Sequence, residues 1–130
     1  MRNGLLPSLF EFLSKNTTKE FPQKIFEVGD AVVVNPKSEV GSDTVRKLAF
    51  AISDTNANFT DVKQALEAVA KGMGWKLSYK ELEHSSFIAG RCAAIIREGK
   101  ESGVIGEISP KVLGNWGLGM PVVAFELQIL

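Results

Sequence analysis

The chain has 130 residues, of which 45% are hydrophobic and 23% charged, with 15 Lys and Arg against 15 Asp and Glu. This length suits one domain. A chain of this size buries about two thirds of the surface that it exposes when unfolded, so it can form a core without disulfides or metal ions. Zero net charge argues against a domain that binds nucleic acid by bulk electrostatic attraction, since such domains carry a basic excess. The single cysteine excludes an internal disulfide and a cysteine-rich zinc site.

The sequence contains no recognisable targeting or membrane segment. One positive charge precedes two leucines, and Pro7 interrupts the apolar run at once, which is unlike a secretory signal peptide. The longest apolar runs are far shorter than the ~20 residues that a membrane-spanning helix needs. We therefore expect a cytoplasmic domain without a membrane partner.

The first half of the chain alternates between helical and strand-like patterns. Leucine and phenylalanine recur at helical spacing over residues 4–16, which predicts an amphipathic helix. Residues 25–34 and 45–53 are predicted strands, joined by a loop at about 36–44 that is rich in polar residues, proline and glycine. Gly29 inside the first strand indicates a bulge or a close backbone approach.

The clearest helix covers residues 59–73, where apolar residues fall at i, i+3, i+4, i+7, i+8 and i+11 from Val62. Asn58 or Thr60 can cap its start, and Asp61 favours the positive end of the helix dipole. Four further strands follow, at residues 75–79, 87–97, 104–108 and 122–129, with a short helix at 110–113 before the last of them. Hairpin-length links dominate, so the residues predict an α+β fold, an antiparallel sheet with helices on one face.

His84 is the only histidine, and Glu81 and Glu83 beside it suggest a metal or acid–base site. A metal site needs three or four ligands at fixed spacing, which one imidazole and scattered carboxylates do not supply. The competing interpretation is an exposed or hydrogen-bonded loop histidine, and we favour it.

A nucleophilic pair of Cys92 and His84 has equally weak support. Cys92 precedes the apolar residues 93–96 and is typical of a buried small hydrophobe, whereas a catalytic thiolate needs an electropositive, partly exposed setting. Arg91 is adjacent, but strand alternation directs it to the opposite face. Glycines at 114–119 fit a helix end and a turn better than a phosphate loop. From the residues alone we predict no catalytic, cofactor-binding or metal-binding residue.

Several segments match recurring passages of one protein family, and they lie at residues 2–9, 25–29, 84–93, 103–113 and 121–127. The first two match R-x-x-L-L-P and L-F-E-I-G, and the third matches H-x-x-F-x-x-G-R-x-A. The fourth matches G-x-x-G-E-(I/L)-H-P-x-V-L, with Ser109 where histidine is common. In this order they resemble the β subunit of phenylalanyl-tRNA synthetase, in its archaeal and eukaryal form.

The resemblance implies the class II aminoacyl-tRNA synthetase fold, an antiparallel sheet flanked by helices, in a module that does no chemistry. Because that β subunit is much longer, we expect residues 1–130 to be one domain, a fragment from the C-terminal part of the catalytic-like module. The family's enzyme is an (αβ)₂ heterotetramer. The implied partners are the catalytic α subunit, the remaining β-subunit domains, and tRNA(Phe) through the complete complex. ATP and magnesium serve the complete enzyme, and we expect no cofactor in this fragment.

The resemblance also lets the loss of chemistry be checked. In the family's catalytic subunit, the second class II motif is a strand that ends in an ATP-binding arginine, and here Val33 or Val34 stands in its place. The third motif is a glycine-rich strand that leads into an arginine, but residues 122–130 contain neither residue type. Losing one such donor costs roughly a hundred- to a thousandfold in rate. We therefore expect an inactive fragment with a filled pocket.

The implied role is structural, since the module would hold the catalytic subunit in the arrangement that attaches phenylalanine to tRNA(Phe). Two alternatives stay open: a stand-alone interaction or regulatory module with the class II synthetase-like fold, and a small enzyme that uses His84, Cys92 and Glu107. The structural role predicts exposed apolar surface for a partner. Phe12 lies off the leucine stripe of its helix and belongs either to that surface or to the core.

Overall fold

All strands of the described part of the chain join one six-stranded antiparallel sheet, in the order β1-β2-β6-β5-β4-β3. A computed structural model describes residues 4–16, 20–34 and 42–129. Its elements are α1 (Leu6–Lys15), β1 (Gln23–Val34), β2 (Ser42–Ser53), α2 (Phe59–Met73), β3 (Leu77–Glu81), β4 (Phe87–Arg97), β5 (Lys100–Ile108), α3 (Pro110–Asn115) and β6 (Val122–Gln128). The order of elements and the antiparallel α+β class confirm the sequence prediction.

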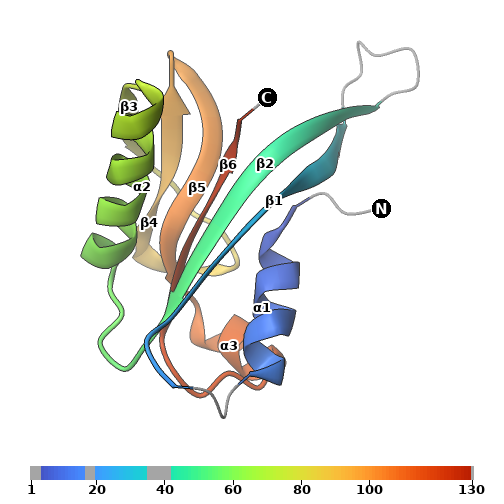
Figure 1. Cartoon of the computed structure of the whole chain (residues 1–130), viewed down its shortest axis with the longest axis vertical. Helices are drawn as coiled ribbons and strands as arrows, with labels where there is room; N and C mark the ends of the chain where they lie inside the picture. Colours follow the sequence, from blue (N-terminus) through green and yellow to red (C-terminus); the bar gives the residue numbers. More distant parts are fainter. Residues whose placement is uncertain (1–3, 17–19, 35–41, 130) are drawn as a thin grey trace.

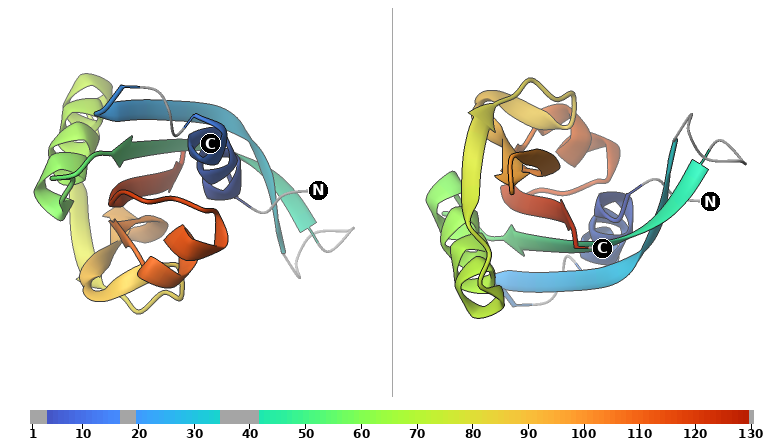
Figure 2. Two further views of the ribbon diagram at one scale, coloured as in Figure 1. Left: turned by 90° about the horizontal axis from the view of Figure 1, so that it is seen from below. Right: turned by 90° about the horizontal axis from the view of Figure 1, so that it is seen from above.

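Helices cover both faces of the sheet, so the prediction of helices on one face was wrong. Figures 1 and 2 show α2 on one face and α1 with α3 on the other. The physical reason lies in residues 48–52 of β2 and 122–125 of β6, where both sets of alternating side chains are apolar. Ala49 and Ala124 pack with the α1 leucines, while Phe125 packs with Val62 and Leu66 of α2. A strand that is apolar on both faces needs cover on both.

The boundaries of α2 follow from its caps. The Asn58 side chain accepts a hydrogen bond from the Asp61 backbone N–H at 3.1 Å, and the Asp61 carboxylate accepts one from the Asn58 N–H. This capping box selects Asn58 over Thr60 as the cap. Gly74 ends the helix with φ of 73°, a left-handed conformation that glycine adopts without strain. The helix over residues 59–73 is therefore confirmed.

Irregularities of the sheet lie in β4 and not in β1. The pairing of β1 with β2 runs continuously through Gly29, so of the two alternatives expected there the bulge was wrong. The register of β4 against β5 shifts between Phe87 and Cys92 and again after Ile95. The loop predicted at about 36–44 lies outside the described residues up to position 41, and from Ser42 the chain already belongs to β2.

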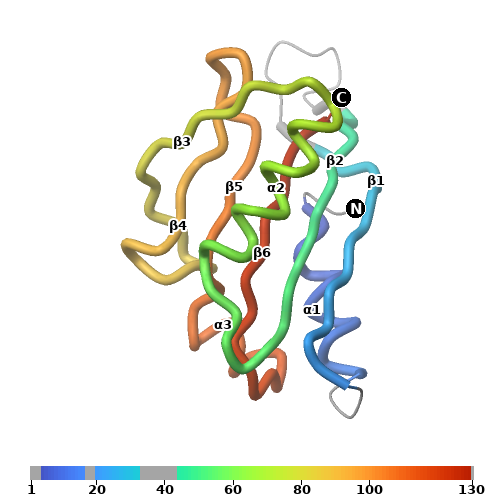
Figure 3. Tube along the Cα trace, turned by 60° about the vertical axis from the view of Figure 1, so that its left-hand side comes forward, coloured from blue at the N-terminus to red at the C-terminus, as the bar shows by residue number. Residues whose placement is uncertain are grey.

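The centre of the sheet is its most buried part. The β6 residues from Val122 to Leu127 are all buried, and α2 packs over β5 and β6 (Figure 3). The half of that face formed by β1 and β2 lies beside α2 and not beneath it. None of the helices in the described ranges is long and apolar enough to cross a membrane.

Candidate protein interface

The outer strand β1 is long and has a free side. It runs for 12 residues and, among the described strands, pairs with β2 alone. The other outer strand, β3, has only 5 residues. The free side of an outer strand presents backbone N–H and C=O groups that can pair with another chain, and proteins usually shorten or cover such an edge. The length of β1 therefore marks it as a place to look for a partner.

Large apolar side chains are exposed next to this edge. Phe26 is 73% exposed and Val28 51% exposed on β1, and Phe12 is 50% exposed on α1. We call these three residues the β1 surface. The exposure of Phe12 settles the choice left open by the sequence, because this ring lies at the surface and not in the core. Exposed apolar groups that gather in one region indicate an interaction site.

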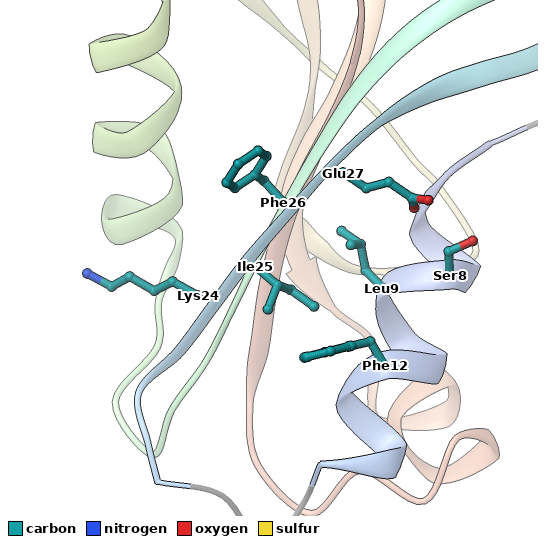
Figure 4. A pocket seen from close by; sticks show the side chains of 7 residues that line it. All are labelled: Ser8, Leu9, Phe12, Lys24, Ile25, Phe26 and Glu27. Atoms are coloured by element: carbon teal, nitrogen blue, oxygen red, sulfur yellow. The ribbon is translucent and has the colours of Figure 1, made fainter.

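A hollow of about 450 Å³ lies between α1 and β1, and we call it the α1-side hollow. Its lining residues are Ser8, Leu9, Phe12, Lys24, Ile25, Phe26 and Glu27. Figure 4 shows Phe12 and Ile25 pointing toward each other across it, whereas Phe26 and Lys24 point to the opposite face of β1. An apolar side chain of a partner could enter this hollow and contact both elements.

A second hollow, of about 360 Å³, lies on the other side of β1, between the strand and α2. The residues that line this α2-side hollow are all apolar: Phe26, Leu48, Phe50, Ala65, Val69 and Phe125. Phe50 and Phe125 form its floor with ring centroids 5.7 Å apart. Phe26 borders both hollows, so β1 carries accessible apolar surface on its two faces.

Charged residues surround this apolar centre. Lys24 is exposed at one end of the exposed face of β1, and Asp30 is exposed at the other. Asp30 accepts a hydrogen bond from Arg46 Nε at 3.2 Å, and both side chains are more than half exposed. An apolar centre with a polar rim is the usual composition of a protein–protein interface.

A buried carboxylate of β6 fixes the start of α1 over the sheet. Glu126 of β6 accepts a hydrogen bond from the Leu5 backbone N–H at 2.9 Å, and Lys47 Nζ lies 3.5 Å from the same oxygen. Within the described residues, the position before α1 supplies no side-chain cap of its own. Because the first backbone N–H groups of a helix lack partners inside it, Glu126 supplies the cap from across the fold.

His84 occupies an exposed loop position, which confirms the interpretation that we favoured. Its Nδ1 accepts a hydrogen bond from the Ser86 backbone N–H at 3.1 Å, and its ring lies edge-on to Phe87. In residues 4–16, 20–34 and 42–129, no group of three or more His, Cys, Asp or Glu is placed to hold a metal ion.

Cys92 is buried, and its thiol donates a hydrogen bond to the Leu82 carbonyl at 3.1 Å. Burial raises the pKa of this thiol, as does the charge of Glu83, while a backbone hydrogen bond at His84 opposes them. The net shift is opposite to what a nucleophilic cysteine needs. His84 thus influences Cys92 through its backbone, and its ring is engaged elsewhere.

The remaining positions that the sequence singled out are Glu107 and the two strands that correspond to the class II motifs. Glu107 accepts a hydrogen bond from Arg91 at 3.2 Å, and that arginine is largely exposed. The strand expected to replace the third class II motif is buried from Val122 to Leu127. Val33 and Val34, where the second motif would place an arginine, are the last two residues of β1, and a filled pocket at this position stays a prediction.

The exposed face of β1 was missed, although the sequence carries a signal for it. Lys24 and Asp30 have the same parity as Phe26 and Val28, so all four side chains lie on one face of the strand. Two charges that bracket two apolar residues indicate a face that the chain itself does not bury. The cap by Glu126 has no such local signal, because it joins residues 121 positions apart.

Known proteins resemble this chain along its whole length. The family described as the phenylalanyl-tRNA synthetase β chain CLM domain matches residues 1–129. The phenylalanine–tRNA ligase β subunits of Thermococcus onnurineus and Methanocaldococcus jannaschii are 50% and 44% identical over 127 and 129 residues. These alignments cover 98% and 99% of this chain but only 22% and 24% of those proteins, so the chain spans about a quarter of their length or less.

A solved structure supports the fold. The pyrrolysyl-tRNA synthetase of Desulfitobacterium hafniense superposes with a TM-score of 0.75 at 15% identity, over 98% of this chain and 47% of that one. A likeness at this identity shows a common architecture, the class II synthetase-like sheet with its helices. With the family match, it establishes that the chain belongs to the CLM domains of the phenylalanyl-tRNA synthetase β chain.

Proposed function

We propose that this domain is a non-catalytic structural part of a phenylalanine–tRNA ligase β subunit. In this role it supports the catalytic α subunit in the ATP-dependent attachment of phenylalanine to tRNA(Phe) in the cytoplasm. The observation that carries the proposal is the β1 surface with its two hollows in a chain of this family, because together they offer a partner apolar contacts on both faces of an outer strand.

The energetic argument concerns the three exposed side chains of the β1 surface. Burying a large apolar side chain stabilises by about 1.5–3 kcal/mol relative to leaving it in water. Phe12, Phe26 and Val28 leave much of that gain unused in the isolated chain. A partner subunit that covers them recovers it, and the rim charges at Lys24 and Asp30 add selectivity.

The chemical argument concerns the residues that a catalytic module needs. Residues 122–130 carry no arginine or glycine, and the pKa of the Cys92 thiol is raised. We propose that the α subunit supplies the groups that bind ATP and magnesium, while this domain contributes shape alone. On this view the isolated domain catalyses no phenylalanine-dependent exchange of pyrophosphate into ATP.

The test uses a chimera of a relative. The 127 residues of the Thermococcus onnurineus β subunit that align with this chain are replaced by this chain, and the chimera is co-expressed with the α subunit of that organism. We expect an assembled enzyme that aminoacylates tRNA(Phe). Phe26→Asp and Phe12→Asp should each lower the recovery of the α subunit, since both place a charge in the covered surface.

Ala68→Asp is the matched control, because it adds the same charge at an exposed α2 position that lines neither hollow. Full assembly and activity of the two phenylalanine variants would contradict the proposed interface. Pyrophosphate exchange by the isolated domain with phenylalanine would contradict the proposed lack of catalysis.

A further inference from the structure

The free side of β1 is complementary to itself. We propose that, without an α subunit, two copies of this chain pair β1 against β1 in antiparallel orientation, about a two-fold axis at Glu27. The paired strands would join two six-stranded sheets into one. This inference goes beyond the proposed function and does not depend on it, because it concerns the chain on its own.

The first step of the argument is the backbone. The outer groups of an edge strand are preorganised to accept another strand, and a long, regular edge with apolar side chains is prone to this pairing. The pairing of β1 with β2 is continuous over all 12 residues, so its free side is equally regular. The other edge, β3, offers only 5 residues.

The second step is the register. Opposite residues of antiparallel strands point to the same face, and a shift by one residue would send every side chain to the other face. With the two-fold axis perpendicular to the sheet, the pairing must therefore be centred on a residue. Each candidate centre fixes which side chains meet.

The centre at Glu27 is favoured by both charge and hydrophobicity. It places Lys24 opposite Asp30 of the second copy, and Phe26 opposite Val28 of the second copy, all on the exposed face. A centre at Phe26 would put Lys24 opposite valine, and a centre at Val28 would put Phe26 opposite aspartate. The Glu27 register thus forms two charge pairs and two apolar pairs by symmetry.

The opposite face of β1 supplies one favourable contact and one unfavourable contact. Ile25 meets Gly29 of the second copy, which has no side chain, so the isoleucine has room. Glu27 meets Glu27 of the second copy, and like charges directly opposite destabilise a strand pair. The dimer should therefore be weak and should dissociate on dilution, and this flaw provides a specific test.

The experiment is sedimentation velocity of the 130-residue chain over a dilution series. Lys24→Asp and Asp30→Lys should each weaken the dimer by about tenfold, because each variant sets like charges opposite each other at two symmetric places. The double variant carrying both changes restores opposite charges and should return the dissociation constant to near the original value. Glu27→Gln should tighten the dimer, since it removes the repulsion at the axis.

Lys111→Asp on α3 is the matched control for the charge change, and it should leave the dimer unchanged. Thermal melts of each variant check folding, and loss of the exposed Asp30–Arg46 pair should affect them little. A chain that stays monomeric at every concentration overturns the proposal. The proposal is also overturned if the double variant does not return the dissociation constant to near the original value, or if Glu27→Gln weakens the dimer. The chimera assay does not depend on either result.

Discussion

The two outer strands of the sheet, β1 and β3, differ in how the chain covers them. β3 is short, and its Tyr79 contacts α2. The Tyr79 hydroxyl donates a hydrogen bond to Glu67, and Lys63 Nζ lies 4.9 Å from the centroid of the Tyr79 ring. β1 is long and leaves Phe26 largely exposed. The fold therefore holds the aromatic side chain of one outer strand against its own helix and leaves that of the other exposed, where we propose that a partner binds.

The largest expected effect comes from a substitution at the centre of the sheet, between β5 and β6, on which both outer strands depend. An added Cβ at Gly103 would lie 2.0 Å from the Glu126 backbone oxygen and 2.9 Å from the Leu127 Cα. The neighbour is the backbone of the central strand, which cannot turn aside. Gly103→Ala should therefore lower the free energy of unfolding by about 3 kcal/mol, measured by urea denaturation. A loss within experimental error would show that β5 and β6 can separate at little cost.

The second prediction loosens the face of the sheet that α1 covers. Glu126→Gln keeps the size of the side chain but replaces the charged cap of α1 and removes the charge that lies 3.5 Å from Lys47 Nζ. We expect a loss of about 2 kcal/mol, because both groups are largely buried. Hydrogen exchange should rise in α1 more than in α2. Equal increases in both helices would mean that Glu126 stabilises the whole fold and not this side.

The third prediction concerns Tyr79 on the outer strand β3. Burial, followed by the hydrogen bond and the charge of Glu67, raises the pKa of the Tyr79 hydroxyl above its ordinary value. The neutral form of Tyr79 is favoured in the folded state. Its contribution to the free energy of unfolding is therefore fully present below the unfolded pKa of about 10. It decreases as the pH rises through that value toward the folded pKa.

The melting temperature should therefore fall above pH 10 in part because of Tyr79. Tyr79→Phe should remove that part, so the difference in melting temperature between the two proteins should shrink as the pH rises. A difference that is the same at pH 8 and above pH 10 would contradict the assignment.

The sequence predicts those features that depend on neighbouring residues and misses those that depend on contacts between distant segments. Helix α2 follows from its own periodicity and from Asn58, which are local signals, and its bounds were predicted to the residue. The exposure of Phe12 could not be decided, because it depends on where α1 lies over the sheet. The placement of helices on both faces was missed for the same reason.

Long-range contacts account for the other misses. The cap that Glu126 provides joins the two ends of the chain, and neither end indicates it alone. The exposure of His84 and the burial of Cys92 were predicted correctly, because both followed from adjacent residues. The exposed face of β1 could be predicted only by considering together the four residues of one parity, Lys24, Phe26, Val28 and Asp30.

The smallest effect on stability is expected at the most exposed ring. Phe26→Asp in the isolated chain should change the free energy of unfolding by no more than about 0.5 kcal/mol, because the ring is 73% exposed. Leu66→Ala, at a fully buried α2 position, is the contrasting control and should cost about 3 kcal/mol. The contrast separates a residue that stabilises the fold from a residue that we propose contacts a partner.

The central claim is that the β1 surface serves assembly and not folding, and one variant measured in two ways tests it most directly. Phe26→Asp is measured by urea denaturation of the isolated chain and by recovery of the α subunit with the chimeric β subunit. The account predicts unchanged unfolding together with a clear loss of the α subunit. Full recovery of the α subunit, or a loss of stability comparable to that of Leu66→Ala, would contradict it.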